Sequence, residues 1–187
     1  MKTLCPKRIL AGLAVFTAGV YAYDVLWIPS QIAKKARAEA NRLKGPLLNV
    51  GAGLPNSSFR AVLVGPTLWG DVNVDLAAPK DVPHGPDAVS YGDAMNLPFE
   101  DNTFAACVAS HLLEHVSDPA KAVAEMQRVT YGNIFLTVPK WWAPHTYLHL
   151  GHRNYISQTG EATPLWPAQI AAKLPGRERS LVAAKLP

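Results

Sequence analysis

The balance of apolar and polar positions changes twice along this chain and divides it into three parts. Residues 9–28 are apolar almost without interruption, and Asp24 is the only charged residue among them. Residues 31–44 are mainly polar and predict a second helix, which Gly45 and Pro46 stop. Beyond that point, short apolar runs alternate with turns rich in Gly, Pro, Asn and Asp, and this predicts buried strands joined by loops.

The short apolar runs have the length and composition of parallel strands that are buried on both faces. We expect a further strand just before Asp93, and a helix that Asp118 caps and Pro119 starts. The runs themselves cover 47–50, 72–76, 105–109 and 133–138. The apolar stripe of the predicted helix consists of Ala122, Val123, Met126 and Val129. Together these elements predict an α/β domain.

Glycines and carboxylates follow the predicted strands at positions that suit a nucleotide-like ligand. Gly51 and Gly53 let the chain turn tightly after the first strand and let a ligand approach the backbone. Asp75 lies 24 residues after Gly51, at the end of the second strand, where a carboxylate can accept hydrogen bonds from ribose hydroxyls. Asp93 follows the third strand and can accept a bond from an adenine amino group.

The fourth strand adds two polar residues to the same edge of the sheet. Ser110 and His111 emerge at its carboxyl end, and ligands of open α/β sheets bind beyond such ends. The alternative to a specific site is an ordinary turn, because an isolated Gly-x-Gly is a weak signal. A dinucleotide-binding domain is the nearest functional rival, but it requires a third glycine where this chain has Asn56.

The stretch 91–104 reads Y-G-D-A-M-N-L-P-F-E-D-N-T-F and continues into S-H-L-L-E-H at 110–115. With N-V-G-A-G at 49–53 before it, the chain resembles the class I S-adenosylmethionine-dependent methyltransferases, particularly the group called type 11. The resemblance implies a Rossmann-like, mostly parallel sheet of about five strands with flanking helices. It also implies S-adenosylmethionine as cofactor, bound by Asn49, Gly51, Gly53, Asp75, Asp93, Ala94, Ser110 and His111.

Several residues depart from the family pattern. Asn49 stands where the family usually has an acidic residue, Pro55 replaces a glycine, and Ala105 replaces an aspartate. The family's last two strands have no clear counterpart, so the resemblance is partly degenerate and carboxyl-terminally truncated. These departures leave two hypotheses open. The chain is an enzyme acting on a small, possibly lipid-associated acceptor, or it is a non-catalytic scaffold with a methyltransferase fold.

The amino-terminal segment predicts a membrane location. The 20 residues of 9–28 match the roughly 30 Å of hydrocarbon that a transmembrane helix must cross, and Tyr21, Tyr23 and Trp27 suit a membrane interface. A cleaved signal peptide, with small residues around Ala22, is the competing interpretation. A buried soluble helix is the third.

Charge is concentrated near this segment. Residues 1–44 hold eight Lys/Arg and two Asp/Glu, whereas 45–187 hold ten and twelve. The positive-inside rule therefore favours a single-pass protein whose globular domain is cytoplasmic. The basic helix at 29–45 can lie on anionic headgroups or serve as a solvated linker. The domain itself offers no electrostatic footprint for nucleic acid, so no such partner is expected.

The segment 140–155 combines aromatic and histidine residues after the fifth strand. Its position predicts the acceptor side of the domain, where His145 and His149 are candidate catalytic bases. A zinc site there would lack acidic or Cys partners nearby, so no metal is predicted, and a packed or interfacial segment is the other interpretation. The predicted organisation is an anchor at 1–28, a juxtamembrane helix at 29–45, a domain at 46–158 and an irregular tail at 159–187.

Overall fold

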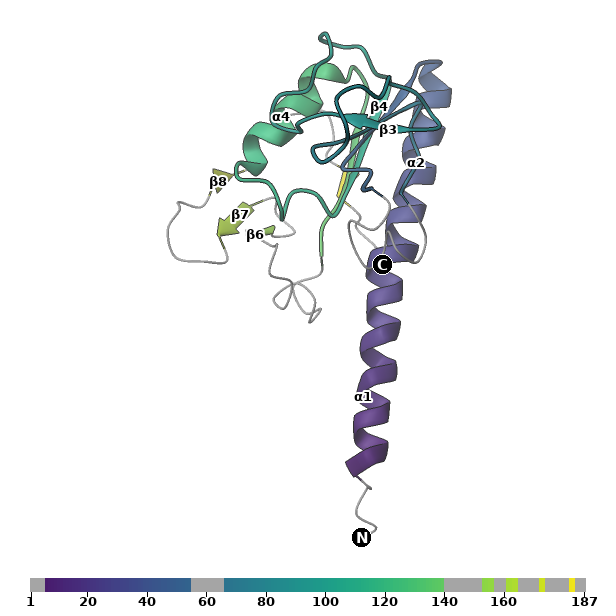
Figure 1. Ribbon diagram of the computed structural model, residues 1–187, viewed down its shortest axis with the longest axis vertical. Helices are drawn as coiled ribbons and strands as arrows, with labels where there is room; N and C mark the ends of the chain where they lie inside the picture. Colours follow the sequence, from purple (N-terminus) through teal and green to yellow (C-terminus); the bar gives the residue numbers. More distant parts are fainter. Residues whose placement is uncertain are drawn as a thin grey trace.

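The computed structural model describes residues 6–54, 66–139, 153–156, 161–164, 172–173 and 182–183. It shows a layered domain from which one long helix projects downward (Figure 1). The helical elements are α1 (Pro6–Tyr21), the π-helical turn η1 (Ala22–Trp27), α2 (Ile28–Leu43) and α4 (Pro119–Val129). The strands are β1 (Leu47–Val50), β2 (Val72–Asp75), β3 (Val89–Tyr91), β4 (Ala106–Ser110), β5 (Ile134–Thr137), β6 (Asn154–Ile156), β7 (Glu161–Pro164), β8 (Ala172–Lys173) and β9 (Val182–Ala183).

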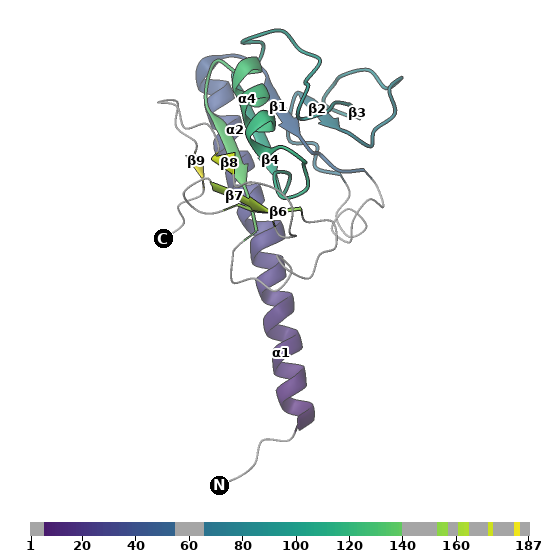
Figure 2. The same ribbon diagram turned by 90° about the vertical axis from the view of Figure 1, so that its left-hand side faces the viewer.

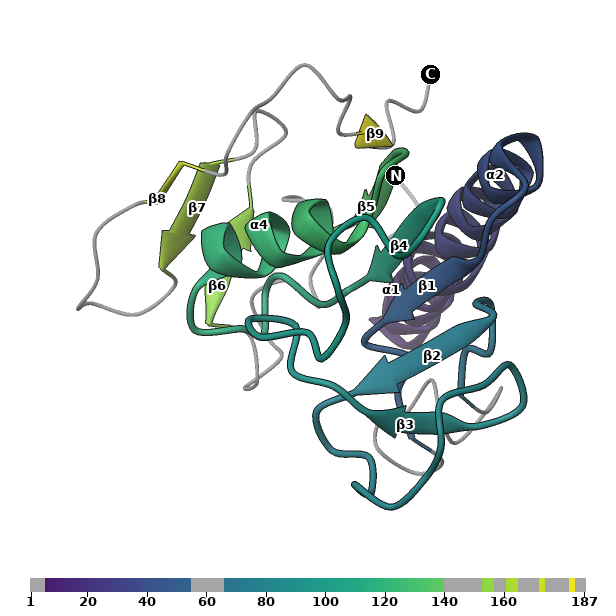
Figure 3. The same ribbon diagram turned by 90° about the horizontal axis from the view of Figure 1, so that it is seen from above.

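The main sheet has the strand order β3-β2-β1-β4-β5-β9, and every neighbouring pair is parallel. Figure 3 shows the strands from above, with β1 and β4 in the middle of the sheet. All residues of β1 and β5 are buried, as expected for parallel strands covered on both faces. The predicted mostly parallel, Rossmann-like sheet is confirmed, and the short strand β9 extends it beyond β5.

Helices cover the two faces of this sheet (Figure 2). On one face, Ile32, Ala36 and Ala40 of α2 form an apolar cluster with residues of β1, β4 and β5. On the other, the predicted stripe of α4 packs against the side chains that point the opposite way. Leu47 belongs to the first cluster and its neighbour Leu48 to the second, because successive side chains of a strand alternate between faces.

The helix predicted at 29–45 is therefore part of the domain. Alanines at 33, 36 and 40 are buried, and their small side chains let α2 lie close to the sheet. The charged residues of α2, which predict either a helix on anionic headgroups or a solvated linker, occupy its outer side, where Lys34 and Lys35 are exposed.

The apolar segment 9–28 is divided between two environments. Helix α1 projects away from the domain, and its Val15 and Phe16 side chains are 74% and 65% exposed. In contrast, Asp24, Val25 and Ile28 are buried against the domain. Among the residues that the structure describes, no helix is both long enough and apolar enough to cross a membrane. Part of the segment predicted as an anchor therefore packs on the domain, and its role in a membrane stays a prediction.

Short strands occur in the carboxyl-terminal region, where an irregular tail was expected. Strands β6, β7 and β8 form a separate antiparallel sheet, and β9 pairs with β5. Strands β8 and β9 have only two residues each, which is too short for any apolar alternation to reveal them.

Candidate functional site

The carboxyl ends of β1, β2 and β4 meet at one edge of the sheet, and the glycine-rich turn lies there. Gly51 and Gly53 have φ angles of 75° and 74°, in the left-handed region that favours glycine. The Gly51 amide donates to the Val74 carbonyl at 2.9 Å. A Cβ at Gly51 would lie 3.0 Å from Cδ1 of Leu112. The turn is therefore packed closely under the loop that follows β4.

Asp75 holds this turn in place. Its Oδ2 accepts a hydrogen bond from the Gly53 amide at 2.9 Å, and its Oδ1 accepts one from the Ala77 amide at 2.9 Å. A carboxylate oxygen has two lone pairs, so both oxygens retain acceptor capacity for a ligand hydroxyl. The structure thus brings together the glycine turn and the carboxylate that the sequence predicted for one ligand.

The Asn49 side chain forms its hydrogen bonds inside the domain. Its side chain is 1% exposed, and its amide donates to the Thr67 carbonyl and, at 3.1 Å, to Oδ1 of Asn73. A carboxylate at this position has no N–H to donate, so the change from acidic residue to Asn suits this internal network. Direct contact between Asn49 and a cofactor stays a prediction.

Asp93 begins a tight turn after β3. Its Oδ1 accepts from the Met95 amide at 2.9 Å, and its backbone carbonyl accepts from the Asn96 amide at 2.9 Å. The neighbouring Ala94 is buried. One Asp93 oxygen, Oδ1, is thus occupied by the turn, and the turn fixes where the carboxylate points.

Arg128 of α4 fixes the chain that follows this turn. Its guanidinium donates to the carbonyls of Leu97 at 3.0 Å and Phe99 at 2.8 Å. It also binds the carboxylates of Glu125 at 2.8 Å and Asp101 at 2.8 Å. The hydrogen bond from Arg128 is the main cause that lowers the pKa of Glu125. The bonds of Arg128 thus connect α4 to the loop that follows Asp93.

The end of β4 carries a buried charged cluster. His111 has a φ of 52°, and its Nε2 donates to the Asp24 carbonyl in η1 at 3.2 Å. Its Nδ1 lies 3.2 Å from Oε1 of Glu114, whose side chain is only 2% exposed. Neither Glu114 carboxylate oxygen has a well-aligned hydrogen bond from the described residues. Beside it, Ser110 Oγ accepts a hydrogen bond from the Thr137 hydroxyl at 2.9 Å.

Charges within the cluster outweigh the effect of burial. Burial alone would lower the pKa of His111, but Glu114 and Asp24 hold it above its usual value. Burial alone would raise the pKa of Glu114, but His111 and His115 hold it below its usual value. Both shifts favour the ion pair. The sequence prediction of ligand-binding residues included His111 and missed Glu114 and Asp24, although a lone acidic residue inside an apolar stretch is a signal for Asp24.

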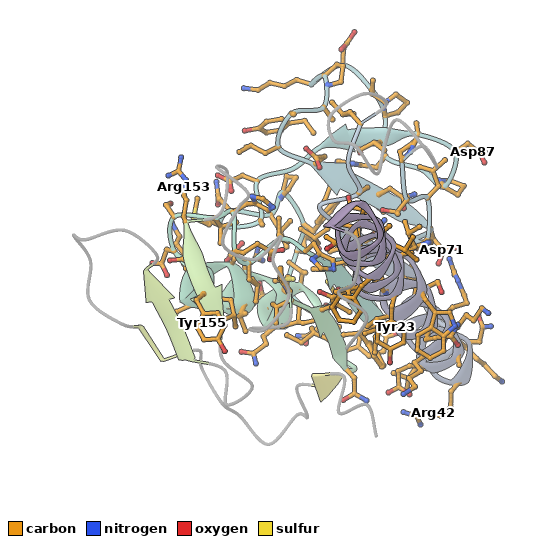
Figure 4. All side chains as sticks on the ribbon, turned by 90° about the horizontal axis from the view of Figure 1, so that it is seen from below. Tyr23, Arg42, Asp71, Asp87, Arg153 and Tyr155 are labelled. Atoms are coloured by element: carbon orange, nitrogen blue, oxygen red, sulfur yellow. The ribbon has the colours of Figure 1, made fainter. Side chains whose placement is uncertain are left out.

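The predicted catalytic residues His145 and His149 lie outside the described residues. Among those that are described, no three His, Cys, Asp or Glu side chains are arranged to hold a metal ion. Figure 4 looks along α1 onto the domain, with Tyr23 on the helix and with Arg153 and Tyr155 on the side where β6 and β7 lie.

Comparison with known proteins supplies an independent line of evidence. A family model described as a methyltransferase domain matches residues 48–133, which include every residue predicted to bind the cofactor. An uncharacterized methyltransferase of Mycobacterium marinum is 32% identical over 157 residues, covering 81% of this chain and 58% of that protein. A demethylmenaquinone methyltransferase of Paenarthrobacter aurescens is 56% identical over 81 residues, covering 43% of this chain and 31% of that protein.

The chain thus spans 58% or less of the length of these two curated relatives. Among solved structures, it is similar to a Thermotoga maritima protein described as an S-adenosylmethionine-dependent methyltransferase and possible histamine N-methyltransferase. That similarity has 19% sequence identity and a TM-score of 0.33, and covers 66% of this chain and 58% of the other.

Proposed function

We propose that this chain is a class I S-adenosylmethionine-dependent methyltransferase that transfers the cofactor's methyl group to a small, lipid-associated acceptor. The observation that carries the proposal is the Asp75 carboxylate, which is fixed against the Gly53 amide and keeps free acceptor capacity. S-adenosylmethionine is the family's cofactor, and when bound it supplies an electrophilic methyl group. The residues of this chain contribute mainly positioning, which can lower the barrier substantially.

The described residues fit this cofactor. In this proposal Asp75 accepts hydrogen bonds from the ribose hydroxyls, and Asp93 accepts one from the adenine amino group. Leu112 packs over Gly51, so a side chain does not fit at this position of the turn. Ser110 completes the edge at the end of β4. Asn49 forms its hydrogen bonds inside the domain, so the shape of the glycine turn does not depend on a contact between Asn49 and the cofactor.

We further propose that α1 anchors the chain to a membrane as a single-pass segment, with the domain in the cytoplasm. Three observations support the proposal. The Val15 and Phe16 side chains of α1 are exposed. The rings of Tyr23 and Trp27 stack with their centroids 5.1 Å apart, and the two residues are 43% and 48% exposed, as suits a membrane interface. The exposed lysines of α2 follow directly and can meet anionic headgroups.

The direction of α1 favours an acceptor from the lipid phase. Turn η1 contacts His111 at the carboxyl end of β4, and α1 runs onward from η1 away from the domain (Figure 1). The edge that carries the cofactor residues therefore faces the way α1 projects. A relative named for demethylmenaquinone agrees with a quinone-like or other lipid-linked acceptor.

A non-catalytic scaffold is the alternative function, and the internal bonds of Asn49 favour it. Calorimetry with S-adenosylhomocysteine on the full chain separates the two. We expect binding, and Asp75→Ala should weaken it by about 1.5–3 kcal/mol through lost hydrogen bonds to a charged group. Asp87→Ala is the matched control, because Asp87 is exposed. A folded wild-type chain that does not bind would favour the scaffold.

The membrane proposal has its own experiment. The full chain should pellet with membranes and resist carbonate extraction, and deletion of residues 1–21 should release it. The deletion stops before η1 because Asp24, Val25 and Ile28 pack on the domain. A mature amino terminus at Tyr23 would instead identify the segment as a signal peptide, and a full chain that carbonate extracts would refute the anchor.

A further inference from the structure

We propose that His111 and Glu114 form the acid–base pair for the methyl acceptor, and that the Asp24 carbonyl occupies the place of the acceptor's hydroxyl group until an acceptor binds. The proposal rests on methyl transfer as the proposed function. The sequence predicts a role for His111 in binding the cofactor. The surroundings of its ring point to the acceptor instead.

The two nitrogens of His111 have different neighbours. Nδ1 lies 3.2 Å from a buried carboxylate oxygen of Glu114. Nε2 lies 3.2 Å from a main-chain carbonyl of η1, which belongs to a separate element of the chain. A ring oriented by a carboxylate through one nitrogen, with the other nitrogen facing an exchangeable partner, is the arrangement of a general base.

Three energetically unfavourable features meet at this point. His111 adopts a left-handed φ of 52°, which is unfavourable for a residue with a Cβ. Glu114 is buried without a well-aligned hydrogen bond from the described residues. The helix is π-helical at Ala22–Trp27, where it contacts His111. Strained backbone and π-helical turns concentrate at functional sites, and a buried carboxylate that lacks a well-aligned hydrogen bond needs an explanation.

The location also fits an acceptor site. His111 donates its backbone amide to the Thr137 carbonyl at 3.0 Å, which places it between the carboxyl ends of β4 and β5. The next residue, Leu112, packs over Gly51 of the cofactor turn. Turn η1, which connects α1 to α2, lies against the His111 ring through the Asp24 carbonyl. An acceptor that displaces the Asp24 carbonyl would therefore lie beside the cofactor site.

The chemistry requires an acceptor with a weakly acidic hydroxyl, such as a phenol or hydroquinone. Nε2 first loses to solvent the proton that it donates to the Asp24 carbonyl, which leaves a neutral ring with its proton on Nδ1 beside Glu114. Nε2 then takes the hydroxyl proton while the acceptor oxygen forms its bond to the methyl carbon and the methyl–sulfur bond breaks. The imidazolium that results is stabilised by Glu114 and later releases its proton to solvent. The titratable groups that face His111 are Glu114 and Asp24, with His115 acting on Glu114.

The experiment measures methyl transfer from tritiated S-adenosylmethionine to 1,4-naphthohydroquinone by the full chain. His111→Asn should lower kcat by about 10²–10⁴-fold, the usual contribution of a general base, and leave S-adenosylhomocysteine affinity unchanged. Glu114→Gln should move the rise of kcat with pH to lower pH, because it removes the carboxylate that raises the pKa of His111. The exposed His84 supplies a control, and His84→Asn should change none of these quantities.

Two results would overturn the proposal: unchanged kcat in His111→Asn, or an unmoved pH profile in Glu114→Gln. A loss of kcat that merely follows lost cofactor affinity would overturn it too. If the wild type binds S-adenosylhomocysteine but does not methylate the probe, ¹⁵N NMR decides. Adding naphthohydroquinone must then shift the Nε2 resonance of His111, and no shift refutes the pair. Absent cofactor binding would refute the proposed function and with it the role of the pair in methyl transfer, whereas Glu114→Gln must still lower the pKa of His111 if the two side chains are coupled.

Discussion

Arg128 is expected to contribute more to stability than any exposed arginine of the chain, and Arg128→Met tests this. The guanidinium donates to two main-chain carbonyls and binds two carboxylates. Methionine preserves much of the apolar stem and removes all of these bonds. Removal leaves the Leu97 and Phe99 carbonyls without this partner and frees the loop after Asp93 from α4.

The magnitude follows from these bonds. A hydrogen bond to a charged group contributes about 1.5–3 kcal/mol, and the two carbonyl bonds are of this kind. Carboxylate pairs near the surface add about 0.2–1 kcal/mol each. The Arg128 side chain is 32% exposed, so solvent replaces part of what is lost. We therefore expect Arg128→Met to lower the free energy of unfolding by about 2–4 kcal/mol.

Urea denaturation of the full chain measures this, with Arg42→Met as the matched control. Arg42 pairs with Glu39 on the surface of α2, and its side chain is 65% exposed. Its removal should change stability little. Arg128→Lys should recover only part of the loss, because an ammonium cannot reproduce the planar fork of donors. Equal effects of the two methionine substitutions would refute the reasoning.

Three further predictions concern other parts of the domain. Gly51→Ala should lower both the stability of the domain and its affinity for S-adenosylhomocysteine, because the new Cβ meets Leu112 at 3.0 Å in a left-handed backbone. Gly85→Ala is the control, because a Cβ at Gly85 has open space around it. Calorimetry and urea denaturation measure the two variants, and equal effects would contradict the prediction. Burial raises the pKa of Cys107, so its thiol should react only when the domain opens. In a Cys5→Ser variant, iodoacetamide should therefore label Cys107 only as fast as the domain unfolds. Rapid labelling of the folded chain would disprove this. The raised pKa of His111 contributes stability that is fully present below pH 6.5 and lost as pH rises through the folded value, whereas the lowered pKa of Glu114 contributes stability present above pH 4.5 and lost as pH falls. Urea midpoints should therefore show the pair's contribution at its greatest between those two pH values, and a His111→Asn, Glu114→Gln double variant with the same pH dependence as wild type would argue against the ion pair.

The sequence predicted the parts of the domain whose local patterns are strong. Strand β1 is an uninterrupted apolar run, and α4 begins at a proline after a capping aspartate, which accepts from the Lys121 amide. The proposed cofactor residues are the glycines and carboxylates that follow the strand ends. Each of these features is encoded within a few neighbouring residues.

Other features depend on contacts between distant segments and have no local pattern. Asp24 is 87 residues from His111 in the chain, and only the packing of η1 on the sheet brings them together. The role of α2 as a cover for the sheet depends on small alanines, which a charge-based interpretation overlooks. Strand β9 pairs two residues with β5 across a long stretch of chain.

The π-helical turn has a consequence for the angular phase of the amino-terminal helix. A π turn holds one residue more than an α turn, and each residue of an α-helix advances by about 100° around the axis. Removing a single residue from Ala22–Trp27 would allow a regular helix and rotate α1 by about that angle, while α2 kept its contacts with the sheet. The side of α1 that carries Phe16 is thus set by the length of η1, independently of the packing of the domain.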